Sequence, residues 1–348
     1  MLKYSLKRIL LAFITAFIIL TMTFFLVKSL PPTGVISPSE NVRMAFYIDQ
    51  VSLGYVTDKK ELTPSLGKLL EHIKDSAGVD HYFYQTPIIH QYFRWLGNIV
   101  TKWDWGRSTV IEPNTSAIII IGTRLPVSIS VNIISVLISV PLGIALGILA
   151  GLKKNTWLDH TISTLVMVFI SIPSFVVITL LIYWLSYQTG WLPSTWPTPD
   201  QSTKTRALAY IIPVLSLSFG SVCGYTRFVR AELCEVMSSE YLLLARTKGL
   251  TKNQAIVRHA LRNAFVPILP SVLAEFIGIF GGSMILESIY SSPGIGSLYI
   301  KALNQANPDY NVLMVDMAIF TTIGLLAGIL LDLSYGFLDP RIRMGEKK

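Results

Sequence analysis

Long runs of uncharged, apolar residues are the feature that most constrains how this chain can fold. Val127–Leu152 and Thr161–Gln188 contain no charged residue at all. A helix needs about 20 apolar residues to cross the hydrocarbon core of a bilayer. Four further runs reach this length: Ile9–Val27, Ala207–Thr226, Ala264–Leu286 and Asn311–Leu331. The sequence therefore predicts an all-α, polytopic membrane protein with six transmembrane helices.

The distribution of Lys and Arg predicts the orientation of these helices. If the N-terminus is cytoplasmic, sixteen Lys and Arg residues fall in the inside segments, and three fall in the short outside loops: Lys204, Arg206 and Lys301. Cytoplasmic loops carry such an excess. We therefore expect a multi-pass protein of the cell (plasma or inner) membrane with both termini cytoplasmic. This topology also explains the net charge of +8, so lipid is the expected environment and nucleic acid is not an expected partner.

The N-terminal run also resembles a signal peptide, because Lys3, Lys7 and Arg8 precede it. The run is long for a signal core, and no small-residue cleavage site follows it. We therefore expect it to be retained as the first span.

Residues 28–123, between the first two spans, predict a small extracytoplasmic subdomain. Pro31, Pro32 and Pro38 favour irregular structure at its start. Helical patterns are expected over Leu62–Lys74 and Gln91–Val100. Whether this subdomain docks a partner, covers a pathway or has only a structural role stays open.

A long basic loop of helical pattern follows the fourth span. Ser239 is expected to cap a helix over Glu240–Lys248, and Gly249 to end that helix in a left-handed conformation. Thr251 and Gln254 have the spacing of a capping box for a second short helix. The positive-inside rule explains the charge of this loop but not its ordered, capped structure. Two short helices joined at a glycine favour a rigid projection that passes force between a soluble partner and the spans.

Particular residues of this loop match a known pattern. Tyr241 is followed by Ala245, Arg246, Lys248, Gly249 and Leu250, and the loop ends with an unbroken run from Arg258 to Ala264. In both parts the loop resembles the coupling loop of ABC importer permeases of the dipeptide and oligopeptide branch. The resemblance continues along the chain at Asp104–Ser108, Arg124–Pro126, Ser171–Phe175, Gly282-Ser283, Glu287, Pro293–Gly296, Asp332, Tyr335 and Asp339–Arg343.

The resemblance implies a type I ABC importer permease fold with three parts. Residues 1–27 would form an N-terminal cytoplasmic stub and the first transmembrane helix, and residues 28–123 the extracytoplasmic subdomain. Residues 124–348 would form the core permease domain, with the coupling loop at 239–263. By the same resemblance, the residues expected to contact an ATPase are Glu240, Tyr241, Ala245, Arg246, Lys248, Gly249, Leu250, Arg258, His259, Leu261 and Arg262.

The resemblance also implies the partners. We expect a second, homologous permease subunit, two cytoplasmic ATPase subunits and an extracytoplasmic substrate-binding lipoprotein that delivers peptides. No Gly-x-x-x-x-Gly-Lys-Ser/Thr motif occurs in the sequence, so ATP and Mg²⁺ are expected in the partner subunits. This chain is accordingly expected to be a transport subunit without a cofactor, a catalytic residue or a metal site of its own.

Two carboxylates inside the spans, Glu275 and Asp316, keep another class of function open. A charged side chain in the membrane is costly and is a candidate for function, as in a proton-coupled secondary carrier. Such a carrier does not need a coupling loop, so the ATP-driven importer is preferred. A relative that carries nickel, metal chelates or glutathione is a third possibility. The sequence does not identify the substrate, the substrate-binding residues or those that line the pathway.

Overall fold

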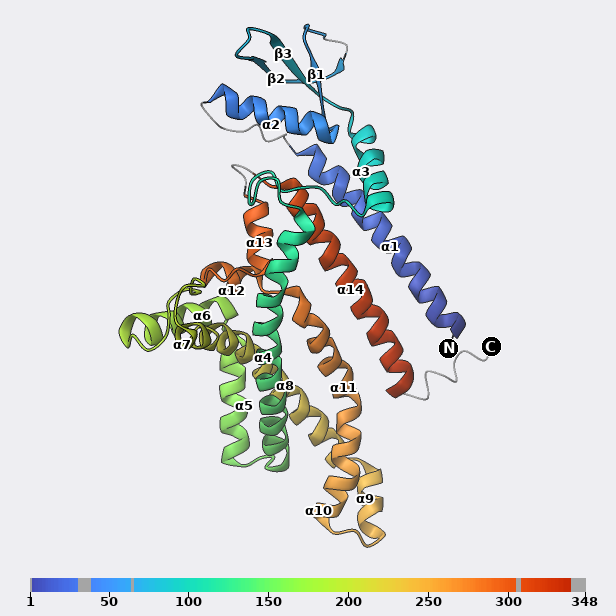
Figure 1. Ribbon diagram of the computed structural model, residues 1–348. Coiled ribbons are helices and arrows are strands. Elements are labelled where there is room, and N and C mark those ends of the chain that lie inside the picture. Colours follow the sequence, from blue (N-terminus) through green and yellow to red (C-terminus); the bar gives the residue numbers. More distant parts are fainter. Residues whose placement is uncertain (1, 31–38, 64–65, 305–307, 339–348) are drawn as a thin grey trace. The chain divides into compact units, whose positions relative to one another are not determined.

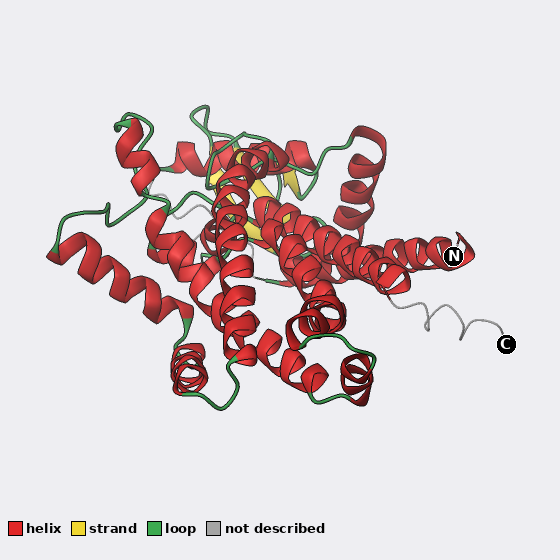
Figure 2. Ribbon diagram, turned by 90° about the horizontal axis from the view of Figure 1, so that it is seen from below, coloured by secondary structure: helices red, strands yellow, loops and turns green. Residues whose placement is uncertain are grey.

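The computed structural model describes residues 2–30, 39–63, 66–304 and 308–338, which are largely helical (Figures 1 and 2). The chain forms two compact units. The first consists of Met1–Ala12, Arg124–Leu298 and Thr322–Lys348, and the second of Phe13–Thr123 and Tyr299–Thr321. The prolines predicted to start the extracytoplasmic subdomain and the motif Asp339–Arg343 lie outside the described residues.

The helices follow one another along the chain with a short sheet between the second and third. They are α1 (Leu2–Ser29), α2 (Glu40–Leu53), α3 (Ile88–Lys102), α4 (Ala117–Leu152), α5 (Trp157–Ile170), α6 (Ser174–Leu181), the π-helical η2 (Ile182–Gln188), α7 (Thr203–Leu208), α8 (Ile211–Met237), α9 (Glu240–Thr247), α10 (Lys252–Ala255), the π-helical η3 (Ile256–Ala260), α11 (Leu261–Gly278), the 3₁₀ turn η4 (Ile279–Gly281), α12 (Met284–Ile289), α13 (Ile295–Ala302) and α14 (Tyr310–Leu338).

Five helical segments of the described chain are long and apolar enough to cross a membrane: Leu6–Ser29, Ala117–Leu152, Thr203–Met237, Lys252–Ile289 and Tyr310–Asp332. The sixth predicted span consists of two helical pieces that meet at a bend of 95°. Pro173 lies at this break, just before α6. Its ring disfavours a helical conformation for the residue before it, which is why α5 ends there. Counted as one broken span, the pair brings the number to the six predicted.

Helices α4 and α8 of the first unit approach each other closely at glycine residues. Gly143, Gly147 and Gly151 repeat every four residues along α4. A Cβ atom added at Gly143 or Gly147 would lie 2.6 Å from the Cβ atom of Tyr225 or Val229, respectively. Small residues let helix backbones approach closely in membranes. This glycine stripe therefore packs against α8 of the same chain.

The second unit contains a three-stranded antiparallel sheet of strand order β1-β3-β2, with β1 at Val56–Lys59, β2 at Leu69–Lys74 and β3 at Asp80–Gln85. Its core consists of Tyr47 from α2 together with Val56, Ile73 and Phe83 from the strands. The rings of Tyr47 and Phe83 stack with their centroids 4.8 Å apart. Apolar side chains on one face of the sheet thus bury against α2, as a half-buried sheet requires.

Of the two helices predicted in this region, one is wrong and the other is confirmed. The helix expected over Leu62–Lys74 is wrong, because Leu69–Lys74 is strand β2 and pairs with β3. A tight turn fixes this hairpin: the Asp75 carboxylate accepts hydrogen bonds from the backbone N–H groups of Ala77 and Val79, at 2.9 and 2.8 Å. The Val79 bond is the main cause that holds the pKa of Asp75 below its ordinary value. The helix expected over Gln91–Val100 is confirmed as α3.

A buried carboxylate ties two distant parts of the second unit. One oxygen of Asp309 accepts a hydrogen bond from the Ser108 hydroxyl at 2.5 Å. The same oxygen accepts the backbone N–H groups of Thr109, Val110 and Ile111 at 3.0–3.1 Å. Asp309 itself is fully buried. Because four donors converge on one anion, the segment that leads into α4 is fixed against the segment that leads into α14.

Candidate functional site

The loop between α8 and α10 has most of the local structure that its sequence predicts. Helix α9 begins after Ser239 and ends at Thr247, one residue earlier than expected. Gly249 follows in a left-handed conformation with φ of +93°. The Thr251 hydroxyl accepts the Gln254 N–H at 3.3 Å, and the Gln254 side chain accepts the Thr251 N–H at 3.1 Å. The predicted glycine stop and the predicted capping box are both present.

Two details of the loop differ from the prediction. The Ser239 hydroxyl does not cap α9 but donates to the Val236 carbonyl at 2.5 Å. The second helix is not a separate short helix either: α10 continues through the π-helical turn η3 into α11, and Lys252–Ile289 counts as one apolar span. The π-helical turn over Ile256–Ala260 joins α10 to α11 without a non-helical residue between them. The helix of the loop and the fifth span are therefore continuous (Figure 1).

A small apolar cluster fixes this loop to the helices around it. Leu242 of α9 and Ala255 of α10 pack with Leu233 of α8 and with Ala260 and Ala264 of the fifth span. All five side chains are buried. The loop is thus a packed part of the first unit, so a force on α9 is transmitted to both spans.

The residues expected to contact an ATPase divide by exposure. Ala245 is buried, and Leu250, His259 and Leu261 are half-buried. The exposed ones are Glu240, Tyr241, Arg246, Lys248, Gly249, Arg258 and Arg262. Two further apolar side chains of α9, Leu243 and Leu244, are 62% and 56% exposed. Exposed apolar side chains beside basic ones, on a helix outside the spans, are typical of a surface for another protein.

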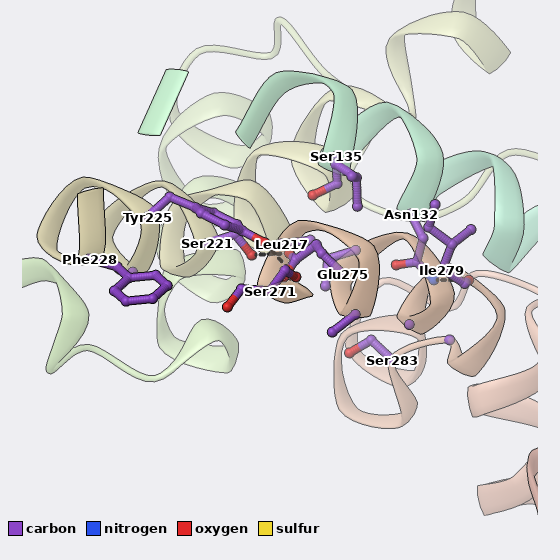
Figure 3. A pocket seen from close by; sticks show the side chains of 15 residues that line it. Asn132, Ser135, Leu217, Ser221, Tyr225, Phe228, Ser271, Glu275, Ile279 and Ser283 are labelled. Carbon is purple, nitrogen blue, oxygen red and sulfur yellow. Dashed lines mark hydrogen bonds between the residues drawn. The ribbon is translucent and has the colours of Figure 1, made fainter. Parts of the chain in front are cut away.

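The first unit also contains a cavity of about 680 Å³ between α4, α8 and α11, shown in Figure 3. Cavities of this size hold small organic solutes in other proteins. Both polar and apolar side chains line it, among them Asn132, Ser135, Leu217, Ser221, Tyr225, Phe228, Ser271, Glu275, Ile279 and Ser283.

Glu275 is one of the two carboxylates that the sequence singled out, and it lies in this cavity. It is half-buried on α11 and accepts a hydrogen bond of 2.5 Å from the Ser221 hydroxyl of α8. Nearby, the Tyr225 hydroxyl donates to the Ser271 carbonyl at 2.9 Å, and the Asn132 amide donates to the Ile279 carbonyl at 2.8 Å. These bonds join the three helices while leaving the carboxylate in the cavity.

Asp316, the other carboxylate, lies in the second unit. It is on α14 and is fully buried. Its chain neighbours Met314, Val315 and Ala318 are buried as well. Glu275 and Asp316 therefore belong to different units and have different surroundings.

Glu287 forms a buried polar cluster whose contacts the sequence did not predict. Its carboxylate accepts the Ser128 hydroxyl at 2.6 Å and the backbone N–H of Ser297 at 2.9 Å. A Cβ atom at Gly294 would lie 2.3 Å from the second oxygen of Glu287. Glycine is therefore needed here for space, which explains why a glycine-rich segment follows α12.

A buried ion pair was also missed. Asp159 of α5 is fully buried and accepts two hydrogen bonds from the Arg230 guanidinium of α8, at 2.5 and 2.9 Å. Asp159 also accepts the Asn155 backbone N–H at 2.9 Å. Such a two-pronged pair fixes geometry as well as charge. In the sequence, Arg230 is one of the sixteen basic residues that predict the topology, and no local signal connects it with Asp159.

Comparisons with known proteins identify a family and several full-length relatives. The family described as binding-protein-dependent transport system inner membrane component matches residues 143–344. The dipeptide transport system permease protein DppB of Lactococcus lactis subsp. cremoris is 32% identical over 345 residues, covering 99% of this chain and 100% of the relative. DppB of Bacillus subtilis is 30% identical over 348 residues, which is 100% of both chains.

The oligopeptide transport system permease protein OppB of Escherichia coli K12 is 32% identical over 99% of this chain and 100% of its own. Among solved structures, a chain from "Crystal structure of an amino acid ABC transporter with histidines" matches with a TM-score of 0.48 and 18% identity. That match covers 62% of this chain and 92% of the solved one.

Proposed function

The chain belongs to the family of binding-protein-dependent transport system inner membrane components, and on this premise we propose that it is the permease subunit of an ATP-driven peptide importer. A second, homologous permease completes the translocation pathway with it. Two ATPase subunits hold ATP and Mg²⁺ and supply the energy. A substrate-binding protein on the other side of the membrane delivers peptides.

The observation that carries the substrate class is the end-to-end similarity to dipeptide and oligopeptide permeases. The similarity covers the extramembrane part as well as the spans, so it is not confined to a motif that many importers share. A cavity of about 680 Å³ with polar and apolar walls is large enough for a short peptide.

The loop between α8 and α10 supports the ATPase partner. Tyr241, Leu243 and Leu244 of α9 are exposed, and Arg246 and Lys248 beside them are exposed and basic. In this proposal α9 inserts into a groove of one ATPase subunit. Closure of the ATPases on ATP then moves α9. The continuous helix that begins at Lys252 and extends into the membrane moves with it. The basic loop and both termini are cytoplasmic, in agreement with the excess of Lys and Arg on that side.

Replacement of Gly249 by proline tests the coupling. Gly249 has φ of +93°, and its N–H donates to the Arg246 carbonyl at 3.0 Å. Proline fixes φ near −65° and has no N–H, so Gly249→Pro must distort the loop. Cells that depend on this transporter should lose ATP-dependent uptake of radiolabelled tri-alanine, while the membranes contain normal amounts of the protein.

Gly78→Pro is the matched control, since Gly78 has φ of +84° and its N–H donates to the Asp75 carbonyl at 3.0 Å. The backbone is disturbed in the same way, but in the turn between β2 and β3 of the second unit. Uptake should persist in that variant. Undiminished uptake with Gly249→Pro would refute the coupling role. Uptake that continues without ATP and follows a proton gradient would instead identify a secondary carrier.

A further inference from the structure

Glu275 is an acidic side chain in the cavity wall, and the proposed function assigns it no role. Fifteen residues of the described chain line the cavity, and Glu275 is the one acidic residue among them; none is Lys, Arg or His. The walls come from α4, α8 and α11, together with Ile279 of η4 and Gly282-Ser283. A cavity with one carboxylate and no base attracts cations and disfavours anions, more strongly in surroundings of low dielectric constant than in water.

The carboxylate of Glu275 also has room for more hydrogen bonds. An ionised carboxylate offers about four acceptor positions, and within the described part of the chain the Ser221 hydroxyl is the donor that Glu275 has, at 2.5 Å. That bond goes to one oxygen and orients the carboxylate from α8. Tyr225 and Asn132, two other donors of the cavity wall, are directed to the carbonyl groups of Ser271 and Ile279. Acceptor positions of Glu275 beyond the one that Ser221 occupies are thus open to solvent or to a solute in the cavity.

Building on the proposed function, we propose that Glu275 binds the ammonium group of the peptide in transit. A transporter that accepts many sequences can rely only on what all peptides share, namely the backbone and the two termini. An α-ammonium has three N–H donors and a positive charge, which suit a carboxylate that has one donor already. The Ser221 hydroxyl keeps the carboxylate hydrogen-bonded when no peptide is present, which limits the cost of releasing the cargo.

The test measures binding to the purified transporter of both permeases and both ATPase subunits, without the substrate-binding protein. Equilibrium dialysis compares radiolabelled Ala-Ala-Ala with N-acetyl-Ala-Ala-Ala. At pH 7 the free peptide should bind about tenfold more tightly or better, the factor that hydrogen bonds between charged groups typically give. Glu275→Gln should make the two affinities equal. Glu235→Gln, an exposed glutamate on α8 outside the cavity, should keep the preference.

A second measurement needs no variant, so it is independent of any folding defect. The α-amino group of a peptide loses its proton near pH 8, and at pH 9.5 the preference of the wild-type transporter for the free peptide should disappear. Tyr225 is the other titratable side chain of the cavity wall, and phenols ordinarily ionise near pH 10. N-acetyl-Ala-Lys-Ala, which stays cationic at pH 9.5, tests whether a side-chain ammonium is accepted. Recovered affinity would assign the site to any peptide ammonium, and unrecovered affinity would assign it to the α-ammonium.

Equal affinity of the wild-type transporter for free and acetylated tri-alanine at pH 7 would overturn the proposal, as would a preference that survives in Glu275→Gln or at pH 9.5. Equal affinity is the result expected if a basic side chain of the second permease neutralises Glu275. Uptake of tri-alanine into cells is measured in parallel. Its absence with the wild-type transporter argues against a peptide importer, whereas uptake without a binding preference removes only the role of Glu275.

Discussion

The ion pair between Asp159 and Arg230 should be among the most sensitive points of the first unit. Replacing Arg230 by methionine keeps most of the side-chain stem and removes the charge. Asp159 is then left fully buried, with the Asn155 N–H at 2.9 Å and the Ser163 hydroxyl at 3.2 Å as its donors in the described structure.

The size of the effect follows from these contacts. Removing one partner of a buried ion pair typically costs 3–5 kcal/mol. Two donors remain on Asp159, so we expect a loss near the lower end, about 3 kcal/mol. Asp159→Asn keeps an oxygen for the Asn155 N–H, and Arg230, whose side chain is 32% exposed, can be hydrated. That change should cost about 1–2 kcal/mol.

A double-mutant cycle measures whether the two residues act together. Unfolding of the purified protein in mixed detergent micelles, followed by tryptophan fluorescence, gives the free energy for the wild type, both single variants and the double variant. The double variant should lose about 3 kcal/mol, less than the two single losses combined, because the second substitution removes a contact already broken. Arg227→Met, an exposed arginine of α8, serves as the control and should change stability by less than about 0.5 kcal/mol.

Strictly additive losses would contradict this account, since they would mean that Asp159 and Arg230 contribute independently. A stable Arg230→Met variant would contradict it more directly. It would mean that the buried carboxylate is satisfied without its guanidinium partner.

Three further outcomes follow from contacts described above. Leu243→Asp should leave the permease stable but weaken its co-purification with the ATPase subunits at least tenfold, whereas Leu62→Asp, equally exposed in the second unit, should not. Gly294→Ala should destabilise the first unit by about 1–3 kcal/mol in the same unfolding assay, because the new methyl group would overlap the Glu287 carboxylate. Asp309→Asn replaces an acceptor of four hydrogen bonds by an amide, and should lower the midpoint of thermal unfolding; an unchanged midpoint would show that a neutral acceptor suffices.

The parts of the fold that depend on neighbouring residues were predictable from the sequence. Whether a helix can cross a bilayer depends on the composition of about 20 consecutive residues, and the five continuous spans were found in this way. The left-handed Gly249 and the Thr251 capping box were found because their partners lie within five residues. Pro173 explains the bend in the remaining span, but its angle depends on packing with other helices.

The parts that depend on distant contacts were not predictable. The prediction of a helix at strand β2 was wrong because pairing with β3, and not the local residue pattern, decides the conformation of this segment. Asp159 and Arg230 are 71 residues apart, and Ser128 and Glu287 are 159 apart, so only the folded chain brings them together. The cavity wall was unpredictable for a related reason. When nearly every residue of a span is apolar, hydrophobic periodicity does not distinguish the face toward lipid from the face toward a cavity.

The helix that runs from Lys252 to Gly278 through α10, η3 and α11 has a consequence for energy transduction. It holds the loop between α8 and α10 at one end and Glu275 further along, about 35 Å apart at 1.5 Å per residue. Thermodynamic linkage requires that two binding events on one moving element affect each other by the same factor. Suppose that nucleotide binding moves this helix and lowers the affinity of Glu275 for a solute. The bound solute must then lower the affinity for the nucleotide by the same factor. The cargo would thus act as an allosteric effector of nucleotide binding, and no separate signalling element would be needed.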